Sequence, residues 1–138
     1  MCIRDRNDLV GNYSALAAYM FRLMIPALDK IDQIRGLEKA VYSKQLGIAG
    51  RIDCVAEYDG VLSIIDFKTA SRKRDEINEN YLIQATFYSI AWEERTGEKI
   101  DQIVILTVTE DGTLDVHKDD PSKYMGRLEK MIAEHKSD

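Results

Sequence analysis

The sequence predicts an α/β protein in which a central mixed sheet is flanked by helices, with the elements in the order α-β-β-β-α-β. Apolar residues recur every three or four positions in two long segments, which is the period of a helix. Runs rich in Val, Ile and Tyr, separated by glycine-containing turns, indicate strands. Strands and helices in this order favour a sheet covered on both faces. We expect a single domain over residues 1–138, because this length suits one core.

The first helical segment extends from about Leu9 to Ile34. Pro26 has no N–H and clashes with the preceding turn, so we expect a kink or a break there. Gly36 is expected to end the helix. Three antiparallel strands joined by short turns are then predicted, over Glu38–Gln45, Ile48–Tyr58 and Val61–Thr69.

The second half of the chain is predicted to contain two helices and two strands. The helical period returns after the third strand, and a continuous apolar run then indicates a strand buried on both faces. After this strand, turn and capping residues divide the rest of the chain into a short strand and a last helix. In order, these elements are a helix over Ile77–Arg95 that ends at Gly97, a strand over Ile100–Thr109, a short strand over Thr113–His117, and a helix that starts at Asp120-Pro121 and ends near His135.

The composition limits the class of protein and its partners. Apolar residues make up 45% of the chain and charged residues 31%, as in ordinary globular domains, and two cysteines and two histidines give no disulfide framework or zinc pattern. No apolar run could cross a bilayer, so we expect a cytoplasmic protein without a membrane partner. The net charge is −5, yet the segment from Arg35 to Arg74 holds eight basic and five acidic residues. That local excess permits a nucleic-acid partner.

An Asp-Gly turn at residues 59–60 is predicted to bring two carboxylates together. Both residue types tolerate positive φ, so we expect a two-residue type I′ turn, which sets the register of the hairpin. Counting outward from the turn, Asp53 lies opposite Asp66, with Cβ atoms about 4.5–5.5 Å apart. Cys54 and Phe67 alternate to the other face, where we expect them in the core.

Like charges opposite each other destabilise a sheet, so a cation is expected between Asp53 and Asp66. Two sources of this cation remain open. Arg51 and Lys68 are expected opposite each other on the same face, where they can neutralise the pair as a structural ion cluster. Alternatively, the carboxylates hold a divalent ion. Mg²⁺ is the natural choice, with Mn²⁺ as the substitute, because Mg²⁺ takes few protein ligands and keeps water and phosphate oxygens.

Three motifs in order resemble the PD-(D/E)XK nucleases. They are G-x-x-D at Gly50–Asp53, D-x-K at Asp66–Lys68 and Q-x-x-x-Y at Gln84–Tyr88. More narrowly, they are similar to the RecB-type branch, which includes phage and mitochondrial genome maintenance exonucleases. The likeness extends from about Glu38 to Thr96. It implies a restriction-endonuclease-like core, which agrees with the order of elements above.

The resemblance implies roles for several residues. Asp53 and Asp66 would be metal ligands, and the backbone carbonyl of Phe67 could complete the metal shell. Lys68 would position or activate the attacking water and offset charge on the phosphate. Glu38 is a further candidate ligand, in the manner of the acidic residue in the family's first motif.

Gln84 and Tyr88 lie on one helical stripe, together with Tyr81. From the residues alone, Gln84 is either a locally satisfied polar side chain or part of a site. The resemblance implies that Gln84 and Tyr88 line the nuclease cleft. Tyr81 is assigned to packing.

The position of Glu38 depends on the first hairpin. If Leu46-Gly47 is a two-residue turn, Glu38 faces Val55 on the side of the acidic pair. Many RecB-type relatives carry a histidine before this point, whereas this chain has none before His117. Either Glu38 substitutes for that histidine, or the chain lacks an N-terminal portion of the full protein.

The implied function is a Mg²⁺-dependent deoxyribonuclease, an exonuclease acting on single-stranded DNA ends in replication, recombination or repair, in the cytoplasm of a bacterial or phage-infected cell. The alternative is a catalytically inactive nucleic-acid-binding or assembly module that keeps the fold, and a third is an unrelated domain with an accidental ion cluster. The oligomeric state is not predicted. We expect four basic residues to contact the phosphates that flank the cleaved bond, and we expect their effect to depend on the salt concentration. They are Arg51, Arg72, Lys73 and Arg74.

Overall fold

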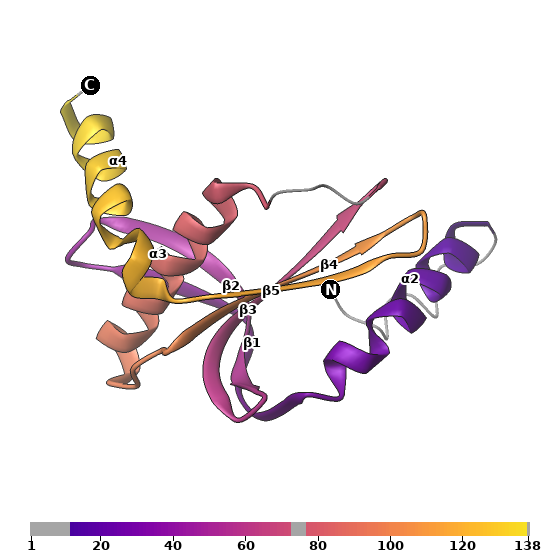
Figure 1. Cartoon of the computed structure of the whole chain (residues 1–138). Helices are drawn as coiled ribbons and strands as arrows, with labels where there is room; N and C mark the ends of the chain where they lie inside the picture. Colours follow the sequence, from indigo (N-terminus) through magenta and orange to yellow (C-terminus); the bar gives the residue numbers. More distant parts are fainter. Residues whose placement is uncertain (1–11, 73–76, 138) are drawn as a thin grey trace.

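The computed structural model describes residues 12–72 and 77–137, with side chains described over 15–72 and 77–134. Five strands form one mixed sheet in the order β1 (Ile31–Ser43), β2 (Ile48–Tyr58), β3 (Val61–Ala70), β4 (Gln102–Thr109) and β5 (Leu114–Asp119) (Figure 1). Only the β3–β4 pair is parallel. The connection from β3 to β4 contains α3 (Glu79–Thr96). Along the chain, α2 (Asn12–Leu28) comes before the first strand, and the last strand is followed by η1 (Pro121–Tyr124) and α4 (Met125–Ser137). The predicted α/β class with a central mixed sheet is confirmed.

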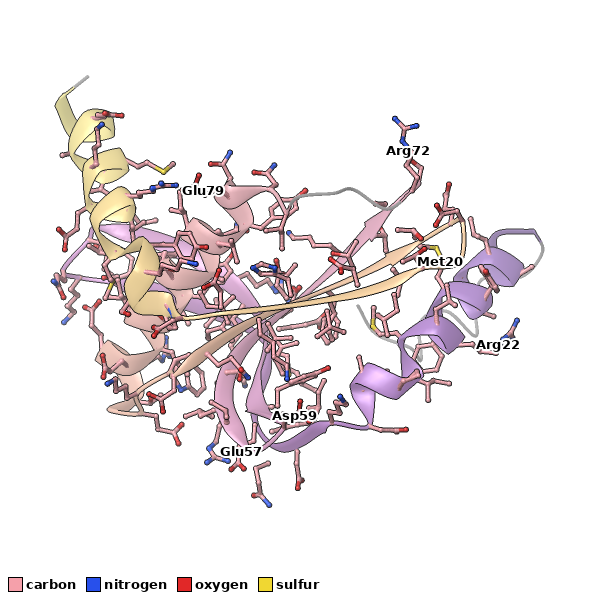
Figure 2. All side chains as sticks on the ribbon, in the orientation of Figure 1. Met20, Arg22, Glu57, Asp59, Arg72 and Glu79 are labelled. Atoms are coloured by element: carbon pink, nitrogen blue, oxygen red, sulfur yellow. The ribbon has the colours of Figure 1, made fainter. Side chains whose placement is uncertain are left out.

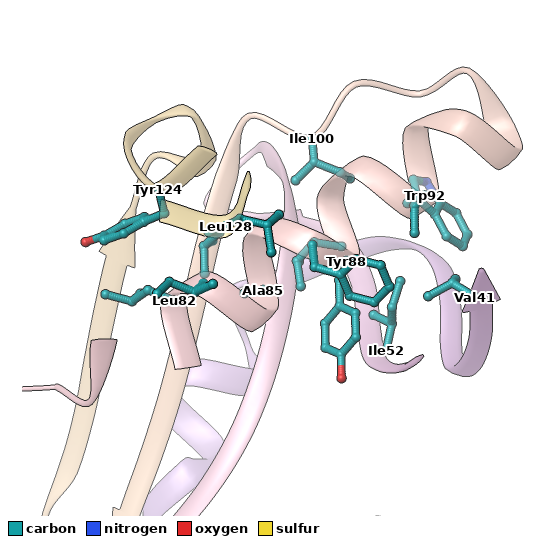
Figure 3. Close-up of a cluster of buried hydrophobic side chains, with 14 of the residues drawn as sticks. Val41, Ile52, Leu82, Ala85, Tyr88, Trp92, Ile100, Tyr124 and Leu128 are labelled. Carbon is teal, nitrogen blue, oxygen red and sulfur yellow. The ribbon is translucent and has the colours of Figure 1, made fainter. Parts of the chain in front are cut away.

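Helices cover both faces of the sheet, as predicted. Helices α3 and α4 lie on one side and α2 lies on the other (Figure 1). On the first side, which we call the α3 face, Ile52, Tyr88 and Leu128 belong to a large buried apolar cluster (Figure 3). On the opposite side, the α2 face, a smaller cluster packs around Ala27 of α2. Among the residues described, no helix is both long and apolar enough to span a membrane.

The first helix is shorter than its periodicity predicts. It ends at Leu28 rather than near Ile34, and it is not divided at Pro26. Gly36 lies inside β1 instead of ending a helix, because the strand already begins at Ile31 and pairs there with the last residue of β2. Pairing with β2 gives these backbone groups hydrogen-bond partners in the sheet, and this tertiary gain overrides the local helical pattern.

The first hairpin turn also differs from the prediction. Ser43 pairs with Ile48, so the turn contains four residues rather than two. The predicted position of Glu38 opposite Val55 is therefore wrong, because Gly36 is the partner of Val55. The two-residue hairpin turns of types I′ and II′ both need positive φ at the first central residue, which a leucine does not readily adopt.

The later elements agree closely with the sequence pattern. Gly97 ends α3 with φ 79°, and its N–H donates to the carbonyl of Glu93 at 2.8 Å. The carboxylate of Asp120 accepts a hydrogen bond from the Ser122 N–H at 2.9 Å and so caps the last helical segment. That segment opens with a short 3-10 turn before α4. Local capping chemistry is thus sufficient to predict these helix ends.

Candidate active site

The second hairpin brings Asp53 beside β3. The turn residues 59–60 have φ values of 51° and 81°, and the β2–β3 ladder follows the predicted register from the turn as far as Cys54 opposite Ile65. The ladder then stops one pair before Asp53 and Asp66. The aspartates are therefore not a regular cross-strand pair, although the register that leads to them is confirmed.

Asp53 lies where β2 loses its alternation. Ile52 and Val55 both pack on the α3 face although they are three positions apart, whereas Cys54 packs on the α2 face. At this irregularity the carboxylate of Asp53 reaches β3, where its Oδ2 accepts a hydrogen bond from the backbone N–H of Phe67 at 3.1 Å. A side chain thus supplies the acceptor for this backbone donor and fixes the direction of the carboxylate.

Asp66 is the buried member of the acidic pair, with only 7% of its surface exposed. Its neighbours Ile65 and Phe67 pack on the α2 face, so alternation turns Asp66 toward the α3 face. Burial, and then a hydrogen bond with the Asp53 carboxyl, raise the pKa of Asp66 to about 7, although Lys68 opposes this rise. Burial and the neighbouring Asp53 carboxyl together disfavour the ionised form of Asp66, so the surrounding protein compensates its negative charge only in part.

Lys68 provides one positive charge at the site. Its Nζ lies 3.1 Å from Asp66 Oδ2. In the described part of the chain Lys68 forms no ion pair with Asp53, and Arg51 forms none with either aspartate. Arg51 is exposed, and because the β2–β3 ladder ends at Cys54 and Ile65, Arg51 and Lys68 are not ladder partners, so that predicted pairing is wrong. The arrangement does not match a structural cluster in which a basic side chain bonds both carboxylates.

Helix α3 contributes two tyrosines next to these charges. Figure 3 shows Tyr88 within the buried apolar cluster. Its side chain is 7% exposed, and burial raises its pKa, with a further rise from the charge of Asp66. The ring of Tyr81 lies under Lys68, with 4.4 Å between Nζ and the ring centroid. Gln84, between the two tyrosines in sequence, is exposed. The sequence pattern did not identify the contact of Tyr81 with Lys68. Tyr81 lies on the same helical stripe as Gln84 and Tyr88, and this position could have indicated that it lies near the site.

Gly50 allows α3 to pack closely on β2. A Cβ atom at this position would lie 2.8 Å from Cε1 of Tyr88 and 3.0 Å from Cε2 of Phe87. Contacts this short force a neighbour to move. Packing therefore explains the glycine of the G-x-x-D motif, because a side chain at this position would displace Tyr88, the tyrosine next to the acidic pair.

We expect Gly50→Ala to lower the free energy of unfolding by about 1–3 kcal/mol, because the added methyl displaces Tyr88 and Phe87. The matched control is Gly126→Ala in α4, where a Cβ would meet nothing within 4 Å. Alanine favours the helix, so this control should be neutral or more stable by up to about 1 kcal/mol. Urea denaturation of both variants measures the difference, and equal effects would contradict the packing argument.

Glu38 lies in β1 with φ 49° and an exposed side chain. The described residues contain no group of three or more His, Cys, Asp or Glu side chains placed to hold a metal ion. Glu38 is therefore not gathered with Asp53 and Asp66 in this conformation. Its assignment as a metal ligand, like the assignment of the Phe67 carbonyl, stays a prediction.

The basic residues expected at the phosphates are only partly described. Arg51 and Arg72 are both exposed, and Figure 2 shows Arg72 projecting at the far end of the β3 ribbon. Lys73 and Arg74 lie outside the described residues. Contact between these side chains and a nucleic acid stays a prediction.

Comparison with known proteins identifies the family. The family model described as the PD-(D/E)XK nuclease superfamily matches residues 8–136. Mitochondrial genome maintenance exonuclease 1 from Homo sapiens is 34% identical over 84 residues, which are 61% of this chain and 21% of the human protein. A component of the ATP-dependent helicase/nuclease from Clostridium kluyveri is 29% identical over 91 residues, or 64% of this chain and 7% of that protein.

A solved structure shares the fold at low sequence identity. It is an exonuclease candidate from Eubacterium rectale, with a TM-score of 0.62 and 14% identity. The match covers 94% of this chain and 55% of that chain. This chain thus spans about half of that protein and a smaller share of the curated relatives.

Proposed function

Because the chain belongs to the PD-(D/E)XK nuclease superfamily, we propose that it is a metal-dependent nuclease that hydrolyses DNA phosphodiester bonds. The observation that carries the proposal is the acidic pair on β2 and β3. Asp53 Oδ2 accepts a hydrogen bond at 3.1 Å from the N–H of Phe67, the residue next to Asp66, and Lys68 Nζ lies 3.1 Å from Asp66 Oδ2. Two carboxylates with one adjacent ammonium group form an arrangement suited to both a cation and a phosphate.

The donor set fits Mg²⁺, or Mn²⁺ in its place. Asp53 and Asp66 offer hard carboxylate oxygens, and the charge of a cation would offset the effects of burial and of the neighbouring carboxyl that raise the pKa of Asp66. Mg²⁺ is commonly held by one or two carboxylates together with water and phosphate oxygens. We propose the carbonyl of Phe67 and the side chain of Glu38 as further ligands. When bound, such an ion would act as a Lewis acid toward the phosphate and would lower the pKa of water.

Lys68 is proposed to hold the attacking water in line with the phosphate and to offset the charge that develops there. Its ammonium group has three N–H donors, and the one contact with Asp66 Oδ2 at 3.1 Å does not use all of them. Tyr88 and Gln84 are proposed to line the approach to the phosphate from α3. The buried Tyr88 would set the depth of the site, while the exposed Gln84 would contact the substrate.

We propose free ends of single-stranded DNA as the substrate, in replication, recombination or repair. The names of the human and mouse relatives, which are called exonucleases, support only the choice of free ends. The basic side chains beyond β3 and on β2 would contact flanking phosphates, so binding should weaken as the salt concentration rises. They are Arg51, Arg72, Lys73 and Arg74.

End-labelled linear DNA and circular DNA, each single- and double-stranded, test this function with Mg²⁺, Mn²⁺ or EDTA present. We expect release of the label from linear single strands only when a divalent metal is present, and we expect circles to stay intact. Cleavage of circles would indicate an endonuclease. Binding without cleavage in every metal would contradict the enzyme and favour a silent nucleic-acid-binding module.

Cys54 provides a test of the opposite face of the sheet. It is 1% exposed, packs on the α2 face, and burial raises the pKa of its thiol to about 11. Cys54→Ser places a hydroxyl among apolar side chains, so we expect a loss of about 1–3 kcal/mol in the free energy of unfolding. Cleavage by the folded variant should be unchanged. Urea denaturation and the end-release assay measure both, and a large loss of activity at unchanged stability would contradict this assignment.

A further inference from the structure

The ammonium group of Lys68 is held between an acidic and an aromatic side chain. Its Nζ lies 3.1 Å from Asp66 Oδ2 and 4.4 Å from the centroid of the Tyr81 ring. A cation within about 6 Å of a ring centroid is attracted to the negative face of the ring. Because Asp66 belongs to β3 and Tyr81 to α3, the two contacts fix the ammonium group between the sheet and the helix.

The start of α3 determines where the Tyr81 ring lies. The side chain of Asn78 caps the helix by accepting from the Asn80 N–H at 2.9 Å, and its carbonyl accepts from the Tyr81 N–H at 3.0 Å. The Tyr81 ring is half-buried and packs against the apolar cluster of the α3 face. Packing of this kind restricts the ring to few rotamers, so it offers Lys68 a fixed surface.

An aromatic ring holds an ammonium group without neutralising it. The Lys68 group has three N–H donors and no acceptor, and Asp66 uses part of this capacity. A carboxylate in place of Tyr81 would accept a further hydrogen bond and cancel the positive charge. The ring attracts the cation through its quadrupole instead, which leaves charge and N–H donors for a water molecule and a phosphate.

We propose that Tyr81 is a positioning residue that directs the Lys68 ammonium group toward the bound phosphate and the attacking water. The inference rests on the proposed nuclease function and adds to it a residue outside the three motifs. Tyr81 acts only through Lys68, and its ring rather than its hydroxyl is the active feature.

Three changes at position 81 in the full chain separate these features. Tyr81→Phe removes the hydroxyl and keeps the ring, and Tyr81→Leu removes the ring. Site-specific tetrafluorophenylalanine keeps the ring shape but weakens its attraction for a cation. With Mg²⁺ and end-labelled single-stranded DNA, the Phe variant should keep the wild-type kcat. The Leu and fluorinated variants should each lose about 10-fold in kcat with little change in KM, since a cation–π contact has about this size.

A spectroscopic measurement on the metal-free protein reports on Lys68 independently of cleavage. In a ¹H–¹³C spectrum, the ε-CH₂ protons of Lys68, assigned with Lys68→Arg, should lie upfield of the other lysines in the wild-type protein and in Tyr81→Phe. They should return to the ordinary position in Tyr81→Leu. This shift requires only a ring beside the lysine, so it stays measurable even if cleavage is weak.

Three results would overturn the inference. They are an unshifted Lys68 signal in the wild-type protein, full kcat in the folded Leu or fluorinated variant, and a loss of kcat in Tyr81→Phe as large as in Tyr81→Leu. If the Leu variant does not fold, the fluorinated variant, compared with Tyr81→Phe, decides alone. A wild-type protein that shows the shifted signal but cleaves DNA with no metal would instead overturn the proposed function, so the two failures are distinguishable.

Discussion

Asp66→Asn should reduce metal-dependent cleavage by about 10²-fold or more, because the substitution removes a metal-binding charge and keeps the size of the side chain. Asp66 is the more buried aspartate and the one that contacts Lys68. Its loss therefore affects both the proposed cation site and the placement of the ammonium group. Rates from the end-release assay over a range of Mg²⁺ concentrations measure the effect, and cleavage at the wild-type rate would contradict the assignment.

Although Asp66→Asn should lower the rate of cleavage, it should raise the stability of the metal-free protein. The pKa of Asp66 is raised from 3.8 to about 7 in the folded protein, so the folded state binds the proton more tightly than the unfolded chain. The contribution of Asp66 to wild-type stability therefore falls as the pH rises from about 4 to about 7. Asparagine has no carboxyl proton to lose and stays neutral, so the variant lacks this decline.

The stability difference between Asp66→Asn and wild type should therefore grow with pH. Without metal we expect the smallest difference near pH 4 and an advantage of about 1–3 kcal/mol for the variant at pH 8, after allowance for its lost ion pair with Lys68. Urea denaturation in EDTA at several pH values measures this trend. A variant that is less stable than wild type at pH 8 would indicate that the ionised carboxylate is a structural requirement.

Lys68→Ala should lose cleavage and also lower the stability of the metal-free protein. Lys68 lowers the pKa of Asp66, so its removal leaves the buried carboxylate without a cation and raises that pKa further. The penalty applies only where Asp66 is ionised. We therefore expect a loss of about 1–3 kcal/mol at pH 8 and a smaller loss at pH 5.

Lys118→Ala is a matched control for this prediction. Lys118 also contacts an aspartate, Asp59 at 2.6 Å, and also lies near a tyrosine ring, that of Tyr58 at 5.2 Å. Both charged groups of this pair are 39% exposed and screened by solvent, so its removal should cost much less stability than the removal of Lys68. If Asp66→Asn destabilises the protein as strongly as Lys68→Ala and cleavage persists, the acidic pair is structural and the nuclease proposal is wrong.

The sequence was informative where local chemistry decides the conformation. The Asp-Gly turn at residues 59–60 sets φ and therefore the register of the hairpin, which the structure follows down to Cys54 and Ile65. Gly97 and Asp120 likewise mark the helix ends where they were predicted. Each of these features depends on neighbours within a few residues, so a single sequence is sufficient to predict it.

Features that depend on distant contacts were not predictable in this way. The irregularity at Asp53 involves a backbone N–H of β3, and the position of Tyr88 depends on the absence of a side chain at Gly50. The early end of α2 and the long β1 likewise follow from pairing with β2. The contact between Lys68 and Tyr81 joins a strand to a helix, so the helical stripe places Tyr81 on the side of Gln84 and Tyr88 but does not identify Lys68 as its partner.

Crystals of the protein soaked in Mn²⁺ test the central claim most directly, because manganese is located by its anomalous scattering. We expect one anomalous peak within coordination distance of carboxylate oxygens of both Asp53 and Asp66, and no such peak in Asp66→Asn crystals treated identically. A structure with no peak, in which the Lys68 ammonium group bonds both carboxylates directly, would contradict a metal site and assign the cluster to structure alone.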